Sequence, residues 1–184
     1  MRKMKRVEDS RTENTYLIMN KHINSYGRLF GGVLMQWIDE MAGIVAHRHA
    51  GTIVTTACVD NLNFKAGAYL GNTVVLIGKM TYVGRTSMEV RIDTYVEDSD
   101  GMRKMINRAY EVMVALDEND NKVEVPGLIV ETEAEKAEWQ GAENVMHSER
   151  KEGLKDSEKF SDRNVTGENR WQKELASYLI HTDC

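Results

Sequence analysis

The chain has 184 residues, of which 41% are hydrophobic, 24 are Lys or Arg and 29 are Asp or Glu. This size predicts one medium-sized domain with room for an appendage. A formal net charge of -5 gives no chain-wide attraction to nucleic acid or to an anionic membrane surface, so we expect neither partner. The two cysteines, Cys58 and Cys184, are too few for a disulfide framework and favour the reducing cytosol.

The composition changes at the only proline of the chain, Pro126. Large apolar residues dominate before it, whereas charged and small polar residues dominate after it and cannot supply a core. We therefore expect a basic N-terminal segment over residues 1–11, a folded domain over residues 12–127 and a polar tail over residues 128–184. Polar residues follow the basic N-terminus where a signal peptide needs an apolar stretch, and no membrane span is readable, so we expect a cytoplasmic protein.

The tail contains two stretches of helical character within an otherwise polar, helical or disordered segment. Residues 133–144 have a helix-forming composition. Trp171, Leu175, Tyr178 and Leu179 recur at i, i+4, i+7 and i+8 and would form one apolar stripe. Such a stripe can dock on the domain or on a neighbouring subunit.

The domain is predicted to begin with a short strand over residues 15–19 and a polar loop over residues 20–28. In residues 30–49, apolar side chains cover most of a helix circumference, which predicts a helix about 30 Å long that other structure surrounds. The remaining polar residues form one narrow stripe on this helix: Gln36, Glu40 and His47, with Gly43.

Four strands are predicted after the helix, over residues 52–64, 73–83, 87–96 and 105–116. Short turns rich in Gly, Asn and Asp separate them, which favours antiparallel neighbours in a meander. This order of elements predicts an α+β fold in which an antiparallel sheet curls around one long central helix. Gly78, in mid-strand, would ease the bend of such a sheet.

Asp39 stands out because it is an acidic residue within an apolar helix. An unpaired carboxylate in a dry environment is costly or is neutralised by a raised pKa. Two of its helical neighbours, Ala42 and Gly43, are small and leave room beside the carboxylate for a ligand. A catalytic carboxylate and a carboxylate held by hydrogen bonds for structure alone are both consistent with this pattern.

The second feature is the loop from Asn24 to Gly32, which ends in the pair Gly31-Gly32 where the helix begins. The first N–H groups of a helix lack internal partners and carry partial positive charge, which suits an oxyanion or a polarised carbonyl. The alternative is that the glycines only allow a tight entry into the helix.

Other kinds of site are disfavoured. His47 and His49 point to opposite sides of a helix and cannot share a metal, so we expect no metal site and a solvated helix end there. Cys58 is interpreted as a small core residue. The sequence has no nucleophile elbow, no phosphate-binding loop of the Walker type and no dinucleotide fingerprint.

The residues from Asn24 to His49 closely resemble the hotdog-fold acyl-CoA thioesterases, in the branch of the brain and cytosolic acyl-CoA hydrolases and their bacterial relatives. The shared pattern is an Asn, a Gly three residues later, a hydrophobic pair, Gly-Gly, and then Asp-Glu with a small pair on the helix. The likeness continues through residues 54–64 and 78–90 and covers about residues 12–127.

The resemblance implies hydrolysis of an acyl-CoA thioester to a carboxylic acid and CoA. Asp39 would act as general base on a water molecule, or by a less favoured route would attack the carbonyl itself. Asn24 of the opposite unit would orient the water or the thioester, and the amide of Gly32, with Gly31 beside it, would stabilise the oxyanion. No cofactor is expected, because CoA is part of the substrate.

The same resemblance implies an assembly in which two hotdog units pair around the active site. This chain has length for one unit, so a homodimer is the minimum active form, and a trimer of dimers is expected. For the CoA portion, family likeness points to Arg85, Thr86 and Ser87. Two other basic residues are weaker candidates: Lys65 and Arg28.

Two other functions remain open. A hotdog dehydratase or hydratase usually places a His near the catalytic acid, and none lies between Asn24 and Asp39. A non-catalytic acyl-CoA sensor would use the same pocket to change its assembly or its partner contacts.

Overall fold

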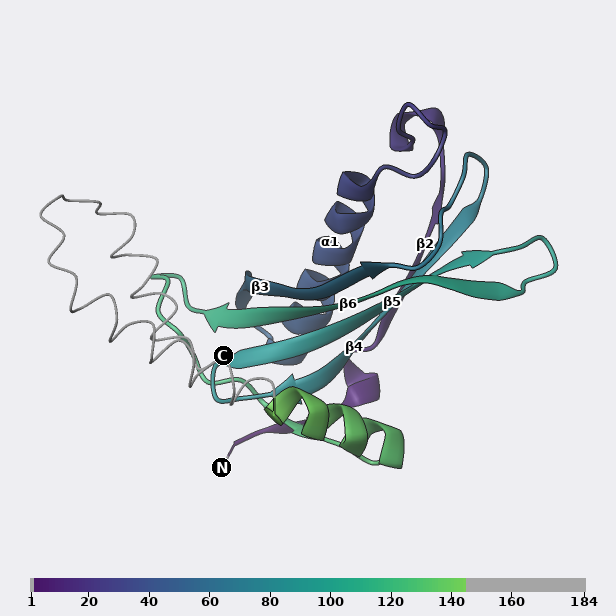
Figure 1. Cartoon of the computed structure of the whole chain (residues 1–184). Helices are drawn as coiled ribbons and strands as arrows, with labels where there is room; N and C mark the ends of the chain where they lie inside the picture. The colour runs from purple at the N-terminus through teal and green to yellow at the C-terminus, as the bar shows by residue number, and fades with distance from the viewer. Residues whose placement is uncertain (1, 145–184) are drawn as a thin grey trace, which may run out of the picture.

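The computed structural model describes residues 2–144, and the predicted apolar stripe from Trp171 to Leu179 lies outside these residues (Figure 1). In chain order the elements are β1 (Met4–Arg6), the 3-10 turn η1 (Val7–Asp9), β2 (Thr12–Leu17), the 3-10 turn η2 (Asn20–His22), α1 (Gly31–Ala50), β3 (Ile53–Phe64), β4 (Thr73–Val83), β5 (Ser87–Glu97), β6 (Arg103–Leu116) and β7 (Gly127–Ile129). Residues 133–144 are helical, as predicted.

The fold is a five-stranded antiparallel sheet that curls around α1 (Figure 1). This confirms the predicted α+β class with its central helix. The strand order is β2-β4-β5-β6-β3, so only β4, β5 and β6 form a meander. The expectation that residues 52–64 neighbour residues 73–83 is wrong, because β3 pairs with β6 and forms the opposite edge of the sheet.

The connection between β3 and β4 explains this strand order. It passes the beginning of α1, where the N–H of Leu29 donates a hydrogen bond to the carbonyl of Ala68 at 2.8 Å. A connection that is held to the start of the helix carries the chain from the edge strand β3 past β6 and β5 to β4, which lies beside the other edge strand, β2. On the side facing away from β6, β3 has no strand partner among residues 2–144.

Helix α1 is buried on the face that lies against the sheet, whereas Met35 and Ile44 on its other side are 46% and 41% exposed. Within residues 2–144 the helix is therefore not surrounded on all sides, in contrast to the prediction from its apolar sequence. It ends at Gly51, whose φ of 73° is the left-handed conformation that glycine adopts without strain. The predicted polar stripe is confirmed, since the exposed Gln36 donates to Glu40 Oε1 at 2.8 Å. The side chains that face the sheet are buried: Leu34, Trp37, Ile38, Met41, Ala42, Val45 and Ala46.

The carboxyl end of α1 differs from the expectation of a solvated helix end. His47 is exposed, but His49 is fully buried, and its Nε2 bonds to the carbonyl of Pro126 at 2.9 Å. Burial lowers the pKa of the His49 imidazole. The cover comes from the two-stranded parallel sheet of β1 and β7, which the sequence patterns did not predict.

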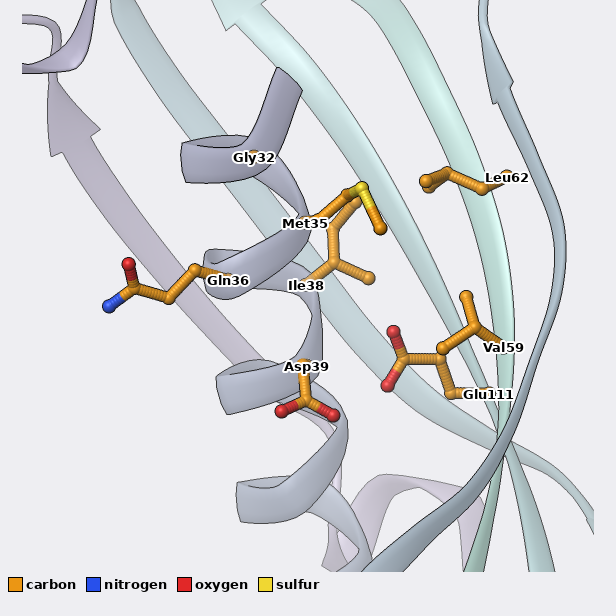
Figure 2. Close-up of a pocket in the computed structure, with 8 residues that line it drawn as sticks. All are labelled: Gly32, Met35, Gln36, Ile38, Asp39, Val59, Leu62 and Glu111. Atoms are coloured by element: carbon orange, nitrogen blue, oxygen red, sulfur yellow. The ribbon is translucent and has the colours of Figure 1, made fainter. Parts of the chain in front are cut away.

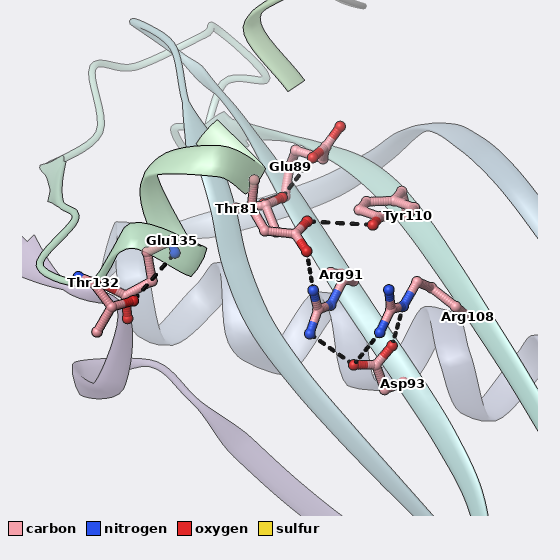
Figure 3. Close-up of polar contacts among 9 residues, drawn as sticks. Thr81, Glu89, Arg91, Asp93, Arg108, Tyr110, Thr132 and Glu135 are labelled. Atoms are coloured by element: carbon pink, nitrogen blue, oxygen red, sulfur yellow. Dashed lines mark hydrogen bonds and ion pairs between the residues drawn. The ribbon is translucent and has the colours of Figure 1, made fainter. Parts of the chain in front are cut away.

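The outer face of the sheet is covered in part by the helical segment 133–144 (Figure 1). Glu138 on this segment pairs with Arg91 on β5 and accepts a hydrogen bond from Tyr110 on β6. The Asp93 carboxylate, which is 7% exposed, accepts hydrogen bonds from Arg91 at 2.8 Å and from Arg108 at 2.5 Å (Figure 3). The helix is therefore attached through a connected ionic network rather than through a single pair.

None of the helices among residues 2–144 has both the length and the apolar character needed to cross a membrane.

Gly78 marks the place where α1 lies closest to the sheet. A Cβ at this position would stand 2.8 Å from Val45 Cγ2 and 2.9 Å from Met41 Cγ. Both atoms belong to buried side chains on α1. The glycine therefore allows the close approach of helix and sheet, in addition to any ease it gives to bending.

We expect Gly78→Ala to lower the free energy of unfolding by about 1–3 kcal/mol, because an overpacked core must shift its side chains. Urea unfolding followed by circular dichroism measures this. Gly141→Ala is the matched control, since a Cβ there would meet no atom within 4 Å. Equal stabilities for the Gly78→Ala chain and wild type would show that the helix can move away from the sheet at no cost.

Candidate active site

A cavity of about 350 Å³ lies between α1 and strands β3 and β6. Figure 2 shows that Asp39 reaches it from α1 and Glu111 from the sheet. Apart from these two residues and Gln36, the cavity is lined by apolar residues. The complete lining is Gly32, Met35, Gln36, Ile38, Asp39, Val59, Leu62 and Glu111. Two carboxyl groups therefore share one cavity whose walls supply few polar partners.

Asp39 is exposed in the single chain, so it is not a carboxylate in a dry core. Asp39 lies beside β3, the edge strand of the sheet. No strand among residues 2–144 covers the side of β3 that faces away from β6, so the carboxylate is open to solvent. Thr56 on β3 donates its hydroxyl hydrogen to Asp39 Oδ1 at 2.5 Å. This contact fixes the carboxylate against the strand.

Glu111 is a member of this site that the sequence analysis missed. The side chain is 1% exposed, and burial together with the charge and hydrogen bond of Asp39 raises its pKa to about 7. On β6 it alternates with the core residues Ala109, Met113 and Ala115, so it points to the inner face of the sheet. An acidic residue at an inward position of an apolar strand is the signal that could have found it.

A second cavity of about 410 Å³ lies at the other side of the helix start. It contains Asn24 and two of the predicted CoA contacts, Arg28 and Lys65. The complete lining is Asn24, Arg28, Leu29, Gly31, Leu34, Phe64, Lys65, Ala66, Gly67, Ala68 and Ile106. Within one chain, Asn24 and Asp39 thus line different cavities.

The two ends of the Asn24 side chain have different surroundings. Its Oδ1 accepts hydrogen bonds from the N–H groups of Tyr26 at 2.9 Å and Arg28 at 3.2 Å. The loop closes through Gly27, whose φ of 70° suits glycine. Because its oxygen holds the loop, the Asn24 amide nitrogen is the end that can donate to a ligand.

The pair Gly31-Gly32 lies between the two cavities, with Gly31 lining the second and Gly32 the first. The carbonyl of Phe30 accepts from the N–H groups of Val33 and Leu34. In the described part of the chain, the N–H groups of Gly31 and Gly32 have no such partner. Two unpaired donors at the start of a twenty-residue helix provide a site of partial positive charge.

The structure separates the five predicted CoA contacts into two groups. Arg28 and Lys65 are exposed beside Asn24, whereas the turn between β4 and β5 contributes to neither cavity. In that turn Arg85 is exposed, but Thr86 and Ser87 are buried. Their assignment as CoA contacts stays a prediction.

Comparison with known proteins identifies the family. Residues 26–102 match the thioesterase superfamily. The chain is 34% identical over 129 residues to the uncharacterized acyl-CoA thioester hydrolase YkhA of Bacillus subtilis, which covers 70% of this chain and 75% of that protein. The chain belongs to the hotdog-fold acyl-CoA thioesterases. The predicted family and the predicted fold are thereby confirmed.

Mammalian members of this hotdog family are longer. The human cytosolic acyl coenzyme A thioester hydrolase is 34% identical over 137 residues, which are 73% of this chain and 36% of that protein. The acetyl-coenzyme A thioesterase of Rattus norvegicus is 31% identical over 158 residues, which are 85% of this chain and 27% of that protein. The chain thus spans about a third of the length of these relatives.

Solved structures of hotdog thioesterases share the architecture over nearly their whole length. An apo hexameric acyl-CoA thioesterase superimposes with a TM-score of 0.78 at 34% identity, covering 82% of this chain and 97% of that one. An acyl-CoA hydrolase of Staphylococcus aureus in complex with butyryl-CoA, CoA and CoA disulfide gives 0.78 at 27% identity, covering 86% and 97%.

Three further structures of the Staphylococcus aureus enzyme carry single alanine substitutions. They replace an asparagine, an aspartate 15 residues further along and a threonine 17 residues beyond that. In this chain the same separations lie between Asn24, Asp39 and Thr56.

We expect stability to depend on pH through Glu111. Its carboxyl titrates near 4.5 in the unfolded chain and near 7 in the fold, so the folded state binds more protons between these pH values. The free energy of unfolding therefore falls as the pH rises through this window. Glu111→Gln has no carboxyl to titrate at this position. Its free energy of unfolding therefore rises relative to wild type from about pH 5 to 7, and the difference between the two proteins is constant above pH 7.

Urea unfolding of both proteins at several pH values measures the difference. Glu89→Gln is the matched control, because Glu89 is also buried in the sheet but bonds Thr81 on the outer face. A difference between Glu111→Gln and wild type that is the same at pH 5 and pH 8 would contradict the shifted ionisation.

Proposed function

We propose that the protein hydrolyses acyl-CoA thioesters to a carboxylic acid and CoA in active sites that two copies of the chain build together. The observation that carries the proposal is the Asp39 carboxylate, held by Thr56 at the mouth of a largely apolar cavity in a chain of this family. The names of the relatives and the CoA complex of the Staphylococcus aureus enzyme support the substrate class. The human relative is a cytosolic protein by name, which supports the cytoplasm as the location.

The free edge of β3 supports the pairing of two copies. Ile53, Val59 and Phe64 on this strand are 51%, 46% and 53% exposed in the single chain. An unpaired edge with large apolar side chains is suited to pairing with a second strand. We propose that β3 pairs with β3 of a second copy and that three such dimers form a hexamer. A related acyl-CoA thioesterase of solved structure is hexameric, which supports the number of copies.

Pairing through β3 would cover Asp39 and bring it near Asn24 of the partner subunit. The separation of Asn24 and Asp39 into different cavities of one chain supports this arrangement. The matching separations of the three residues substituted in the Staphylococcus aureus enzyme support the choice of Asn24, Asp39 and Thr56.

In the proposed reaction Asp39 takes a proton from a water molecule, whose oxygen attacks the thioester carbonyl carbon. The Asn24 amide and the N–H groups of Gly31 and Gly32 donate to the carbonyl oxygen as it becomes negative. The carbon–sulfur bond then breaks, and the CoA sulfur takes the proton from Asp39. No group beyond the protein, the acyl-CoA and water enters these steps.

For the CoA portion we propose Arg28 and Lys65 as contacts, with Arg85, Thr86 and Ser87 reached only if the partner subunit brings them near. Phosphate groups favour positively charged side chains at an accessible surface. Arg28 and Lys65 meet this condition beside Asn24.

We expect Asp39→Asn and Asn24→Ala each to lower kcat about 100-fold or more, because one removes the base and the other a donor to the oxyanion. A panel of short, medium and long acyl-CoAs, assayed for released thiol, measures the effect. Gel filtration checks that the oligomer is intact. Full activity of Asp39→Asn would eliminate Asp39 as the base. Absence of hydrolysis by wild type that still binds CoA would favour an acyl-CoA sensor.

We expect a mixture of the two inactive variants to regain activity. After subunits exchange at equal amounts, half of the dimers contain both variants, and each of these has one site with Asn24 and Asp39 intact. The mixture should therefore reach about a quarter of the wild-type rate. Sites built within one chain would leave the mixture as inactive as its components.

A further inference from the structure

Glu111 is a buried titratable group in the candidate site that the proposed reaction leaves unused. Its carboxyl extends from β6 into the cavity that Asp39 enters from α1 (Figure 2). It is 1% exposed, and its Oε2 has no hydrogen-bond partner among the described residues. Burial of an acidic side chain without full hydrogen bonding is costly, so its presence here calls for a function.

The surroundings of Glu111 favour its protonated form. Across β3 it stands opposite Val59, and across β5 opposite Val90. From α1 the charged group that faces it is Asp39, and none of the residues that line the cavity is basic. The carboxylate form of Glu111 therefore lacks a counter-ion and lies beside a like charge, in agreement with its pKa of about 7.

We propose that Glu111 is a positioning residue that holds a proton against Asp39. As a neutral acid it donates a hydrogen bond to the Asp39 carboxylate, while Thr56 donates from β3. Two donors from two different strands would fix the orientation of the base. This role rests on the proposed function, in which Asp39 activates water.

The consequence is a pH limit that belongs to Glu111. When its proton leaves, the donor is lost and two negative groups share the cavity, so Thr56 alone orients Asp39 against the repulsion of Glu111. An acyl chain in the cavity would exclude water and favour the neutral acid further. The decline of kcat should therefore lie at a higher pH than the decline of kcat/KM.

The test compares pH profiles of wild type, Glu111→Gln and Glu111→Leu on one acyl-CoA. We expect kcat/KM of wild type to fall above about pH 7. Glutamine still donates an N–H but has no proton to lose, so Glu111→Gln should stay within about threefold of wild type at pH 6 and lack the decline. Leucine has no donor, so Glu111→Leu should lose about tenfold or more in kcat at pH 6 with KM nearly unchanged.

Glu89→Gln again serves as the control, because it removes a buried carboxyl from the outer face of the same sheet. Its pH profile should match wild type. An unchanged decline in Glu111→Gln, or full activity of Glu111→Leu, would overturn the proposal.

The outcomes also separate this inference from the proposed function. A wild-type protein that hydrolyses no acyl-CoA would overturn the function and, with it, the role of Glu111 in catalysis. The pH dependence of stability needs no substrate. If the difference in free energy of unfolding between Glu111→Gln and wild type does not change with pH, the proposal that Glu111 holds a proton is wrong, whatever the activity.

Discussion

The packing of α1 into the curve of the sheet is the interaction on which the other features of this protein depend. One face of this twenty-residue helix, from Leu34 to Ala46, is buried in the hydrophobic core that it forms with the sheet. Because the helix touches the sheet closely at Gly78, its rotation and depth are determined by packing rather than by surface contacts. This packing determines the positions of Asp39 and of the pair Gly31-Gly32.

The Asp39 carboxylate lies at the boundary between this packed core and the solvent. Asp39 is open to solvent in the single chain, yet the group behind it, Glu111, is fully buried. Burial and the neighbouring Asp39 raise the pKa of the Glu111 carboxyl to about 7. This places the ionisable pair within the range in which a single proton changes its charge near neutrality.

Periodicity in the sequence was sufficient for the elements and for the central helix, because an apolar run of this length has few alternatives to burial. It failed where contacts join distant parts of the chain. The position of β3 beside β6 depends on a connection that passes Leu29, and the burial of His49 depends on a carbonyl 77 residues away. The inward position of Glu111 on β6 is readable from the alternation of that strand, but its neighbour Asp39 lies on α1, and the sequence does not place the two side chains in one cavity.

The pairing of β1 with β7 determines where additions to the domain can leave it. Met4–Arg6 runs parallel to Gly127–Ile129, and Lys5 donates to the carbonyls of Arg48 and His49 at the carboxyl end of α1. The glycine pair stands at the other end of that helix, about 30 Å away for twenty residues. A segment that leaves the domain from β1 or β7 therefore starts at the pole opposite to the glycine pair.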